Sequence, residues 1–325
     1  MAPFPHPPRT GMPPCAEGGQ PRRSALRLLG PGPAMAEAFP PAGDDFSAFA
    51  EEQILRMPTA EGGHLCYQDR GRGPAVLLGH SHLGNSTMWE PQIRALSRCY
   101  RVIAPDLWGH GASGPLPRGT HDLQALAGHM LSVLDALQID EFAVIGLSAG
   151  GLWGAELARL APGRVRSLAL MGAHLGAEPE ATHRHYSDLL DAIEAAGRIT
   201  PSLVQAIVPL FFRVGTDLDA PHPAAFAHGL ASMPADRLRD SVIPLGRLLL
   251  ARGGAPGRLA ALDPATTLMM CGDSDTACPP RGMQDLAASL GCDAVLVPAA
   301  GHLSNLDNPE AVNHHLLRWL ERTLR

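Results

Sequence analysis

Apolar positions along the chain follow two different periods from residue 53 onward. Short, largely apolar runs predict strands, and longer segments with an apolar residue every three or four positions predict helices. The runs that predict strands span residues 53–57, 64–68, 75–79, 101–105, 142–146, 165–172, 267–272 and 294–298. The segments that predict helices span residues 93–96, 123–138, 283–290 and 310–320, with another that starts at Leu152.

The alternation of these strands and helices predicts an α/β fold. Strands that are apolar on both faces are typical of a parallel sheet covered by helices. Residues 174–252, in contrast, show only helical periodicity, interrupted by prolines. We therefore expect a mostly parallel central sheet flanked by helices, built from residues 46–173 and 253–325, with residues 174–252 forming a helical cap inserted after the sixth strand.

Residues 1–45 differ from the rest of the chain because they are rich in proline and have no apolar period. Eleven of the 31 prolines lie within the first 41 residues. Such a segment buries too little surface to offset its loss of entropy on ordering, so we expect a disordered extension. Arg22-Arg23 before a short apolar stretch is also compatible with an export signal, and Met35 with the start of the native protein.

The composition excludes several classes of protein. A net charge of −6 gives no reason to expect nucleic acid or an anionic membrane as a partner. All 26 basic residues are Arg, which excludes lysine Schiff-base chemistry and a phosphate-binding P-loop. The six cysteines form no C-x-x-C pair, and no apolar run reaches the roughly 18 residues that cross a bilayer. We expect a cytoplasmic protein with mostly reduced thiols, while its oligomeric state stays open.

One serine lies between glycines directly after an apolar run, in the sequence VIGLSAGG of residues 144–151. The strand before it and the helix after it place Ser148 at a strand-to-helix turn, as in a nucleophile elbow. Gly146 and Gly150 leave room for the neighbouring backbone, and the helix N-terminus offers free N–H groups to a developing oxyanion. Ser148 is therefore the candidate nucleophile; the alternative is a chance match to a common five-residue pattern.

A serine nucleophile needs a base and an orienting acid, and both follow in the expected order along the chain. The residues CGDSD (271–275) and AGH (300–302) each come at the end of a predicted strand. Because the carboxyl ends of parallel strands share one edge of a sheet, these side chains are expected near Ser148. We interpret His302 as the base and Asp273 or Asp275 as the acid, although each alone would be an ordinary loop residue.

Five motifs, taken as an ordered set, resemble those of the α/β-hydrolase superfamily, and in particular its small capped bacterial serine esterases and the 3-oxoadipate enol-lactonase group. They are VLLGHSHLGNSTMWEPQI (76–93), RVIAPDLWGHGASG (101–114), VIGLSAGG (144–151), LMMCGDSD (268–275) and VPAAGHLSNLDNPE (297–310). The resemblance implies that Asp275, three residues after Gly272, is the acid. It also implies an oxyanion hole made by the N–H groups of Ala149 and His82. The chain departs from the pattern at Ser81, where many relatives have Gly.

Two further patterns have a weaker functional interpretation. Residues 109–114 match the dinucleotide string G-x-G-x-x-G, but prolines follow where a helix should receive the pyrophosphate, so a tight loop is expected. The pairs His80-x-His82 and His183-x-His185 could each present two imidazoles to a metal ion. No further ligand stands at a recognisable spacing, so we expect no metal and no cofactor.

These residues together predict a serine hydrolase of the carboxylesterase type, which cleaves a small, largely uncharged carboxylic ester through an acyl-enzyme. Hydrolysis of a lactone, an enol-lactone or a carbon–carbon bond by the same triad is the alternative, and a ligand-binding protein without turnover is the non-enzymatic one. Packing of the cap competes with substrate binding as the role of the candidate pocket residues. These are Leu147, Tyr186, Leu189, Ile193, Phe211 and Phe212.

Overall fold

The computed structural model describes residues 54–59 and 63–324 of the 325-residue chain. The expected disordered extension, the Arg22-Arg23 segment and Met35 lie outside the described residues. Within the described part of the chain, no helix has both the length and the apolar character to cross a membrane.

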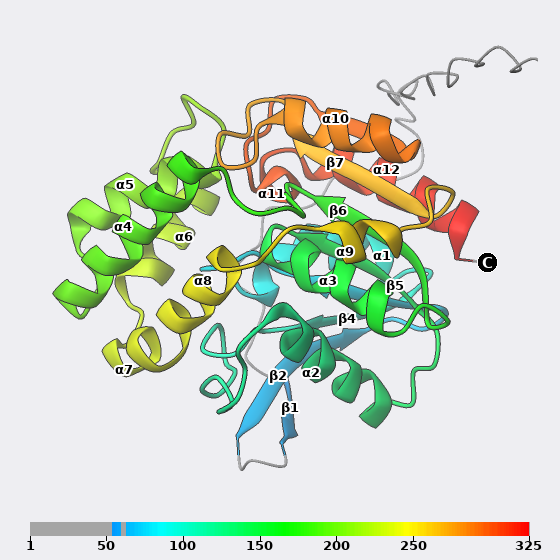
Figure 1. Ribbon diagram of the computed structural model, residues 1–325, viewed down its shortest axis with the longest axis horizontal. Helices are drawn as coiled ribbons and strands as arrows, with labels where there is room; N and C mark the ends of the chain where they lie inside the picture. The colour runs from blue at the N-terminus through cyan, green and yellow to red at the C-terminus, as the bar shows by residue number, and fades with distance from the viewer. Residues whose placement is uncertain (1–53, 60–62, 325) are drawn as a thin grey trace, which may run out of the picture.

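An eight-stranded sheet forms the centre of the molecule (Figure 1). Its strands follow the spatial order β1-β2-β4-β3-β5-β6-β7-β8; β1 and β2 pair antiparallel, β2 pairs antiparallel with β4, and all other pairs are parallel. The predicted, mostly parallel sheet is thus confirmed. The strands are β1 Leu55–Pro58, β2 His64–Arg70, β3 Ala75–Gly79, β4 Arg101–Pro105, β5 Phe142–Leu147, β6 Val165–Met171, β7 Thr267–Gly272 and β8 Asp293–Val297.

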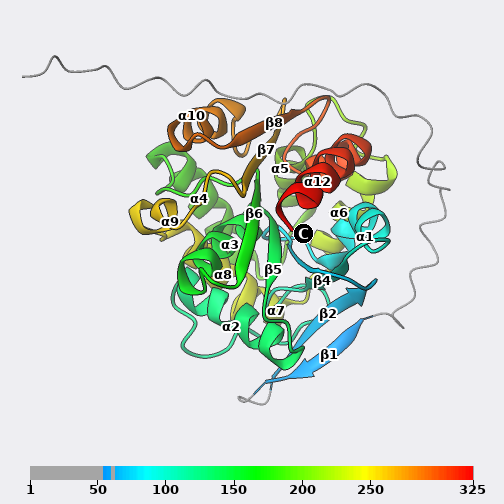
Figure 2. The same ribbon diagram turned by 90° about the vertical axis from the view of Figure 1, so that its right-hand side faces the viewer.

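Helices cover both faces of the sheet (Figure 2). On one face α2, α3 and α10 pack into a core cluster that includes Trp153 and Phe142, and on the other α1 and α12 pack into a second cluster that includes Trp89 and Trp319. Each face therefore has its own hydrophobic core, which explains strands that are apolar at every position. These helices and the short ones beside them are η3 Ser86–Trp89, α1 Glu90–Leu96, α2 Leu123–Ala136, α3 Ala149–Leu160, α9 Pro256–Ala260, α10 Pro280–Leu290, α11 Ser304–Asp307 and α12 Pro309–Thr323.

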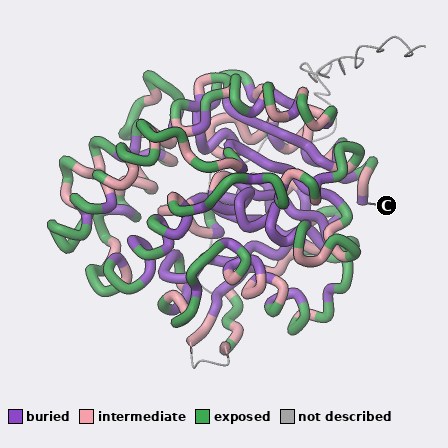
Figure 3. The backbone as a smooth tube through the Cα atoms, in the orientation of Figure 1, coloured by how far each residue is buried: buried purple, intermediate pink, exposed green. Residues whose placement is uncertain are grey.

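The helical insertion lies between β6 and β7 and forms a separate group of helices at one side of the sheet (Figure 1). This position after the sixth strand is the predicted one. Figure 3 shows that buried residues concentrate along the strands, whereas the outer sides of the insertion are exposed. The helices of the insertion are α4 Glu180–Ala196, α5 Pro201–Phe211, α6 Pro221–Ala231, α7 Ala235–Arg237, the π-helical turn η4 Leu238–Val242 and α8 Ile243–Leu250.

Two helix boundaries differ from the sequence-based expectation. Helix α6 forms although Pro221 and Pro223 were interpreted as interruptions, because both prolines lie in its first turn, where no intrahelical N–H bond is lost. Helix α3 begins at Ala149 and not at Leu152, so its first N–H groups lie directly beside Ser148. The glycines at 150 and 151 obscured this start, since glycine is a poor helix former.

Candidate active site

The turn between β5 and α3 holds Ser148 in a strained backbone conformation. Its φ of 53° and ψ of −113° fall in a region that residues with a side chain rarely adopt. The flanking glycines permit this turn: a Cβ on Gly150 would lie 2.0 Å from the carbonyl oxygen of Gly79, and one on Gly146 would lie 2.3 Å from the backbone of Gly150. The turn thus presents the Ser148 hydroxyl beyond the carboxyl edge of the sheet.

Asp275 and His302 form a buried hydrogen-bonded pair at the neighbouring strand ends. Nδ1 of His302 lies 2.9 Å from Oδ2 of Asp275, and the two residues are 5% and 3% exposed. The other carboxylate oxygen, Oδ1, accepts hydrogen bonds from the backbone N–H groups of Ala277 and Cys278 at 2.9 and 2.8 Å. The carboxylate is therefore fixed in orientation, and it holds the Nδ1–H tautomer of His302.

Asp273 has a different position from Asp275. Its carboxylate accepts hydrogen bonds from the backbone of Ala299 at 3.0 Å and Ala300 at 3.3 Å, and from the Ser274 hydroxyl at 2.9 Å. Although burial raises the pKa of Asp273, these hydrogen bonds outweigh burial and lower it. Asp273 thus stabilises the loop that carries His302, whereas Asp275 contacts the imidazole itself.

Gly172 packs against this pair from the end of β6. It has a φ of 49°, and a Cβ at this position would lie 3.1 Å from both Oδ2 of Asp275 and Nδ1 of His302. The absence of a side chain therefore allows the backbone after β6 to approach the Asp275–His302 contact closely.

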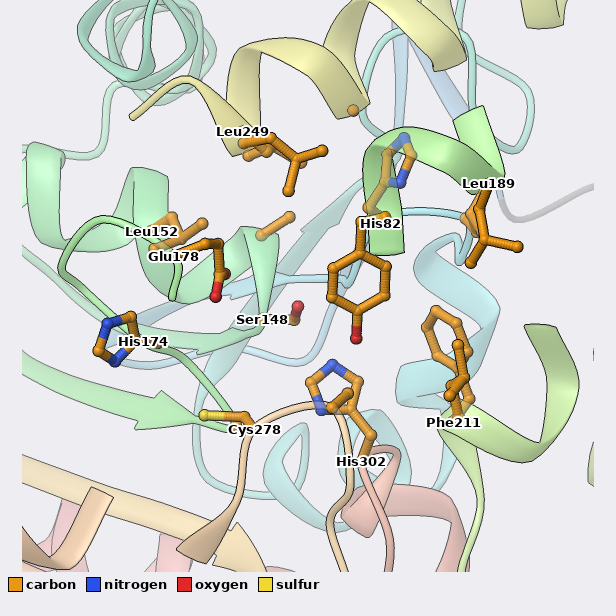
Figure 4. A pocket seen from close by; sticks show the side chains of 18 of the residues that line it. His82, Ser148, Leu152, His174, Glu178, Leu189, Phe211, Leu249, Cys278 and His302 are labelled. Carbon is orange, nitrogen blue, oxygen red and sulfur yellow. The ribbon is translucent and has the colours of Figure 1, made fainter. Parts of the chain in front are cut away.

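A cavity opens over Ser148 between the sheet domain and the cap (Figure 4). It holds about 930 Å³ of empty space, its open mouth included. Ser148 and His302 line the same cavity, and Figure 4 shows the serine side chain beside the imidazole ring in this view. No hydrogen bond joins their side chains in the described part of the chain; unliganded sites often form that bond only with substrate bound.

The cavity accommodates four of the six candidate pocket residues. Tyr186, Leu189 and Ile193 reach it from α4 and Phe211 from the end of α5. The Phe211 ring also contacts the His302 ring edge-on, with ring centroids 5.6 Å apart. The cap therefore contributes apolar walls directly beside the imidazole.

Leu147 and Phe212, in contrast, do not line the cavity, and the expectation for these two residues is wrong. Leu147 is the last residue of β5 and packs fully buried into the core below the sheet edge. Phe212 is 1% exposed and packs against the Phe226 ring, with centroids 5.9 Å apart. Phe212 is the extended residue that follows α5, and its ring turns into the core while the Phe211 ring faces the cavity.

Two backbone N–H groups beside Ser148 lack a partner. Neither the N–H of Ala149, the first residue of α3, nor the N–H of His82 donates a hydrogen bond to another of the residues described by the structure. Both residues line the cavity. Free donors of this kind are what an oxyanion requires, and the N-terminus of α3 adds a favourable dipole.

The imidazoles of His80 and His82, in the loop after β3, lie together with the imidazole of His110. His80 donates from Nδ1 to Ser81 O and accepts from Leu107 N–H at Nε2, both at 2.7 Å. His110 is held in the same way, with Nδ1 2.9 Å from Trp108 O and Nε2 3.2 Å from the Leu83 N–H. These backbone partners fix the neutral tautomers, and burial lowers the pKa of both rings.

The side chain of His82 joins the loop after β3 to the cap. Its Nε2–H donates to the carbonyl oxygen of Val242 in η4, at 2.9 Å. Burial lowers the pKa of His82 to about 4. Because backbone groups already use the ring nitrogens of His80, and those of His82 in part, this pair is not arranged as a metal site; His183 and His185 are exposed on α4. Among the described residues there is no group of His, Cys, Asp and Glu suited to a metal ion.

The glycine-rich segment 109–114 forms a closed loop. The Gly109 N–H donates to Gly114 O at 2.8 Å, and the Ala112 N–H donates to the Asp106 carboxylate at 2.8 Å. The next helix, α2, begins only at Leu123, so no helix N-terminus faces the glycines. The segment lacks the geometry of a dinucleotide site, as expected from the prolines that follow it.

Several cavity residues carried no signal in the sequence. Glu178 and Arg252 line the cavity and form an ion pair across 74 residues of chain, and His174 and Cys278 line it beside them. Burial raises the pKa of the Cys278 thiol to about 12, so this residue is a neutral neighbour of the site. An ion pair between residues so far apart belongs to no local motif, which is why sequence reasoning missed it.

Comparison with known proteins agrees with the fold. A family model described as alpha/beta hydrolase fold matches residues 74–309. The chain is 27% identical to 3-oxoadipate enol-lactonase 1 of Acinetobacter baylyi, over 80% of this chain and 94% of that protein. It is also 37% identical to 2-hydroxy-6-oxo-2,4-heptadienoate hydrolase of Pseudomonas putida, over 43% of this chain and 50% of that protein.

A solved structure, a thermophilic esterase from Thermogutta terrifontis, is similar with a TM-score of 0.71 and 24% identity, over 83% of this chain and 99% of that one. At this identity the likeness concerns the fold alone. The match of the family model over most of the chain shows that the protein belongs to the α/β-hydrolase family. It is a hydrolase of that superfamily, and the resemblance drawn from the five motifs is confirmed.

Proposed function

We propose that this protein is a serine hydrolase that cleaves a small, largely uncharged carboxylic ester through an acyl-enzyme. The observation that carries the proposal is the buried Asp275–His302 hydrogen bond, 2.9 Å between Oδ2 and Nδ1, with His302 lining one cavity together with Ser148 on its strained turn. A buried carboxylate, an imidazole and a half-buried serine hydroxyl that lines a cavity are the components of nucleophilic acyl transfer.

The proposed reaction begins with attack of Ser148 Oγ on the ester carbonyl carbon, while Nε2 of His302 accepts the hydroxyl proton. The Asp275 carboxylate, which holds the Nδ1–H, stabilises the imidazolium that forms. The N–H groups of Ala149 and His82 donate to the tetrahedral oxyanion. His302 then returns its proton to the leaving alcohol, and the acyl group stays on Ser148.

In the second half of the reaction, water attacks the acyl-enzyme and His302 accepts its proton. Collapse of the second tetrahedral intermediate breaks the acyl–Oγ bond and returns the proton to Ser148, which releases the carboxylic acid. The chain supplies every group that transfers a proton or forms a bond, and the overall reaction consumes only the ester and water.

Lactone hydrolysis is the second candidate, favoured by the similarity to an enol-lactonase across 94% of that relative. The first half-reaction would be the same, except that the leaving alcohol stays attached to the acyl group. Carbon–carbon bond hydrolysis with the same triad is the third candidate, and the similarity to the heptadienoate hydrolase supports it.

A fluorophosphonate probe tests the catalytic proposal directly. We expect stoichiometric labelling of the wild-type protein at Ser148 and none in Ser148→Ala, measured by intact mass. A folded wild-type protein that resists labelling would support a ligand-binding protein without turnover. Matched series of p-nitrophenyl esters and lactones then separate the two substrate classes by kcat/KM.

A further inference from the structure

The cavity has two chemically different ends, with Ser148 between them (Figure 4). Figure 4 shows Leu189 and Phe211 on one side of the serine, and Glu178, His174 and Cys278 on the other. Glu178 and Arg252 are the only Asp, Glu or Arg residues among the described residues lining the cavity. One end therefore has an apolar wall of Leu189 and Phe211 near His82, and the other combines a single ion pair with the apolar side chain of Leu152.

The guanidinium of Arg252 is already engaged by the protein. It donates to the carbonyl oxygen of His174 at 3.3 and 3.1 Å, to that of Leu249 at 2.7 Å, and to Oε1 of Glu178. The Arg252 side chain is 3% exposed, whereas that of Glu178 is 15% exposed. Arg252 thus serves as an anchor for Glu178 and has little capacity left for an anionic substrate.

The second carboxylate oxygen of Glu178 is available to a ligand. Oε1 is bound by Arg252, and no hydrogen bond to Oε2 is found in the described part of the chain. Among the other polar groups at this end, the thiol of Cys278 is neutral, and Nε2 of His174 bonds to Ala177 O at 3.1 Å. Because Glu178 lines the cavity and Arg252 binds Oε1, Oε2 is the oxygen left to accept a hydrogen bond from a ligand there.

We propose that Oε2 of Glu178 binds a neutral hydrogen-bond donor of the substrate, a hydroxyl or an amide N–H, at the end of the ester remote from the apolar wall. This inference rests on the proposed ester hydrolysis and adds the substrate class. An ammonium group is disfavoured because the Glu178–Arg252 pair has no net charge, and a third charge would enter the cavity without compensation. A carboxylate would be repelled by Glu178.

The first test compares hydroxyl-bearing esters with methyl isosteres in the wild-type protein. The pairs are p-nitrophenyl 6-hydroxyhexanoate against p-nitrophenyl heptanoate, and 6-hydroxyhexyl acetate against heptyl acetate. In one pair the hydroxyl should raise kcat/KM roughly tenfold or more, as a hydrogen bond to a charged acceptor does. Preference for the methyl compound in both pairs, equal rates, or a larger gain from p-nitrophenyl 6-aminohexanoate would overturn the assignment.

The Glu178→Gln variant tests the residue. Arg252 requires an oxygen acceptor, so the amide oxygen stays with Arg252 and the amide NH₂ takes the place of Oε2. It can donate a neutral hydrogen bond to a substrate hydroxyl but cannot accept the charge-assisted one. The hydroxyl-over-methyl ratio of kcat/KM should fall about tenfold. Glu180→Gln is the matched control, because Glu180 is exposed on α4 and pairs with Arg184; its ratio should stay unchanged. An unchanged ratio in a folded Glu178→Gln protein would overturn the role of Glu178.

A measurement on the wild-type protein covers the case in which Glu178→Gln does not fold. 1,6-Hexanediol should inhibit with a lower inhibition constant than 1-heptanol, and the reverse order would count against the subsite. Failure of this inference differs visibly from failure of the proposed function. An enzyme that labels at Ser148 yet lacks the hydroxyl preference refutes only the subsite, whereas turnover by Ser148→Ala refutes the mechanism itself.

Discussion

The loops at the carboxyl ends of β5, β7 and β8 and the helices of the cap reach the same cavity by different means. The loops hold Ser148, Asp275 and His302 through close glycine contacts between neighbouring strand ends, the Asp275–His302 hydrogen bond and the backbone N–H groups of Ala277 and Cys278. The cap helices instead contribute side chains whose direction depends on how α4, α5 and α8 pack. In the proposed reaction, the chemistry would therefore belong to loops at adjoining strand ends, and the selectivity to a surface assembled by the packing of the cap helices.

The largest effect is expected from replacing the candidate nucleophile. Ser148→Ala removes the attacking oxygen while the backbone turn and both glycines remain, so turnover should fall by about 10⁴ to 10⁶. The measurement is kcat/KM on p-nitrophenyl acetate with the melting temperature as a control. Substantial activity in a folded preparation would place the chemistry elsewhere.

The two aspartates after β7 should give unequal losses. Because Oδ1 of Asp275 accepts two backbone N–H groups, Asp275→Asn should keep its amide oxygen there and turn its NH₂ toward His302. That reverses the imidazole tautomer, and kcat should fall by about 10³ to 10⁴ with little change in KM.

Asp273→Asn is the matched control for this variant, since Asp273 contacts the loop backbone and not the imidazole. Its loss of kcat should stay below about tenfold. Equal losses in the two folded variants, or the reverse order, would show that the acid is wrongly assigned.

The adjacent residues Phe211 and Phe212 distinguish a ring that lines the cavity from a ring that packs in the core. Phe212→Ala should lower the free energy of unfolding by roughly 3–5 kcal/mol, because the ring is buried in the core. Phe211→Ala should instead change the preference among acyl chain lengths several-fold, since that ring lines the cavity. Urea denaturation and a p-nitrophenyl ester series measure the two effects, and an altered chain-length profile in Phe212→Ala alone would reverse the assignment.

Burial of His82, which bonds to the cap, should make the stability of the protein depend on pH. The pKa of His82 is lowered to about 4 when folded, below its ordinary value of 6.5, so the unfolded chain binds more protons between these values. Stability is therefore lost as the pH falls from about 6.5 toward 4, and at pH 5 the loss from His82 is about 2 kcal/mol. His82→Gln should weaken this dependence in denaturation curves measured at pH 5 and 7.

Exposed His121 provides the control, because His121→Gln should leave the dependence as it is in the wild-type protein. The buried rings of His80 and His110 contribute in the same direction as His82 and persist in both variants. If His82→Gln lost as much stability between pH 7 and pH 5 as the wild-type protein does, His82 would not be a source of the pH dependence.

The sequence by itself determined the sheet, the insertion after the sixth strand and the candidate triad. Strand periodicity and glycine spacing are local properties, and the carboxyl ends of parallel strands meet at one edge whatever the details of packing. Ser148 and His302 could therefore be named from their places in the chain, and the choice of Asp275 over Asp273 required the family pattern as well.

Only the tertiary structure decided which cap residues face the cavity. Phe211 and Phe212 are equivalent in the sequence, and their roles separate because α5 packs with one ring toward His302 and the other toward Phe226. The Glu178–Arg252 pair joins residues on either side of the inserted helices, and Gly172 meets the Asp275–His302 contact from a third strand. Such contacts depend on the relative placement of distant segments, which no local period encodes.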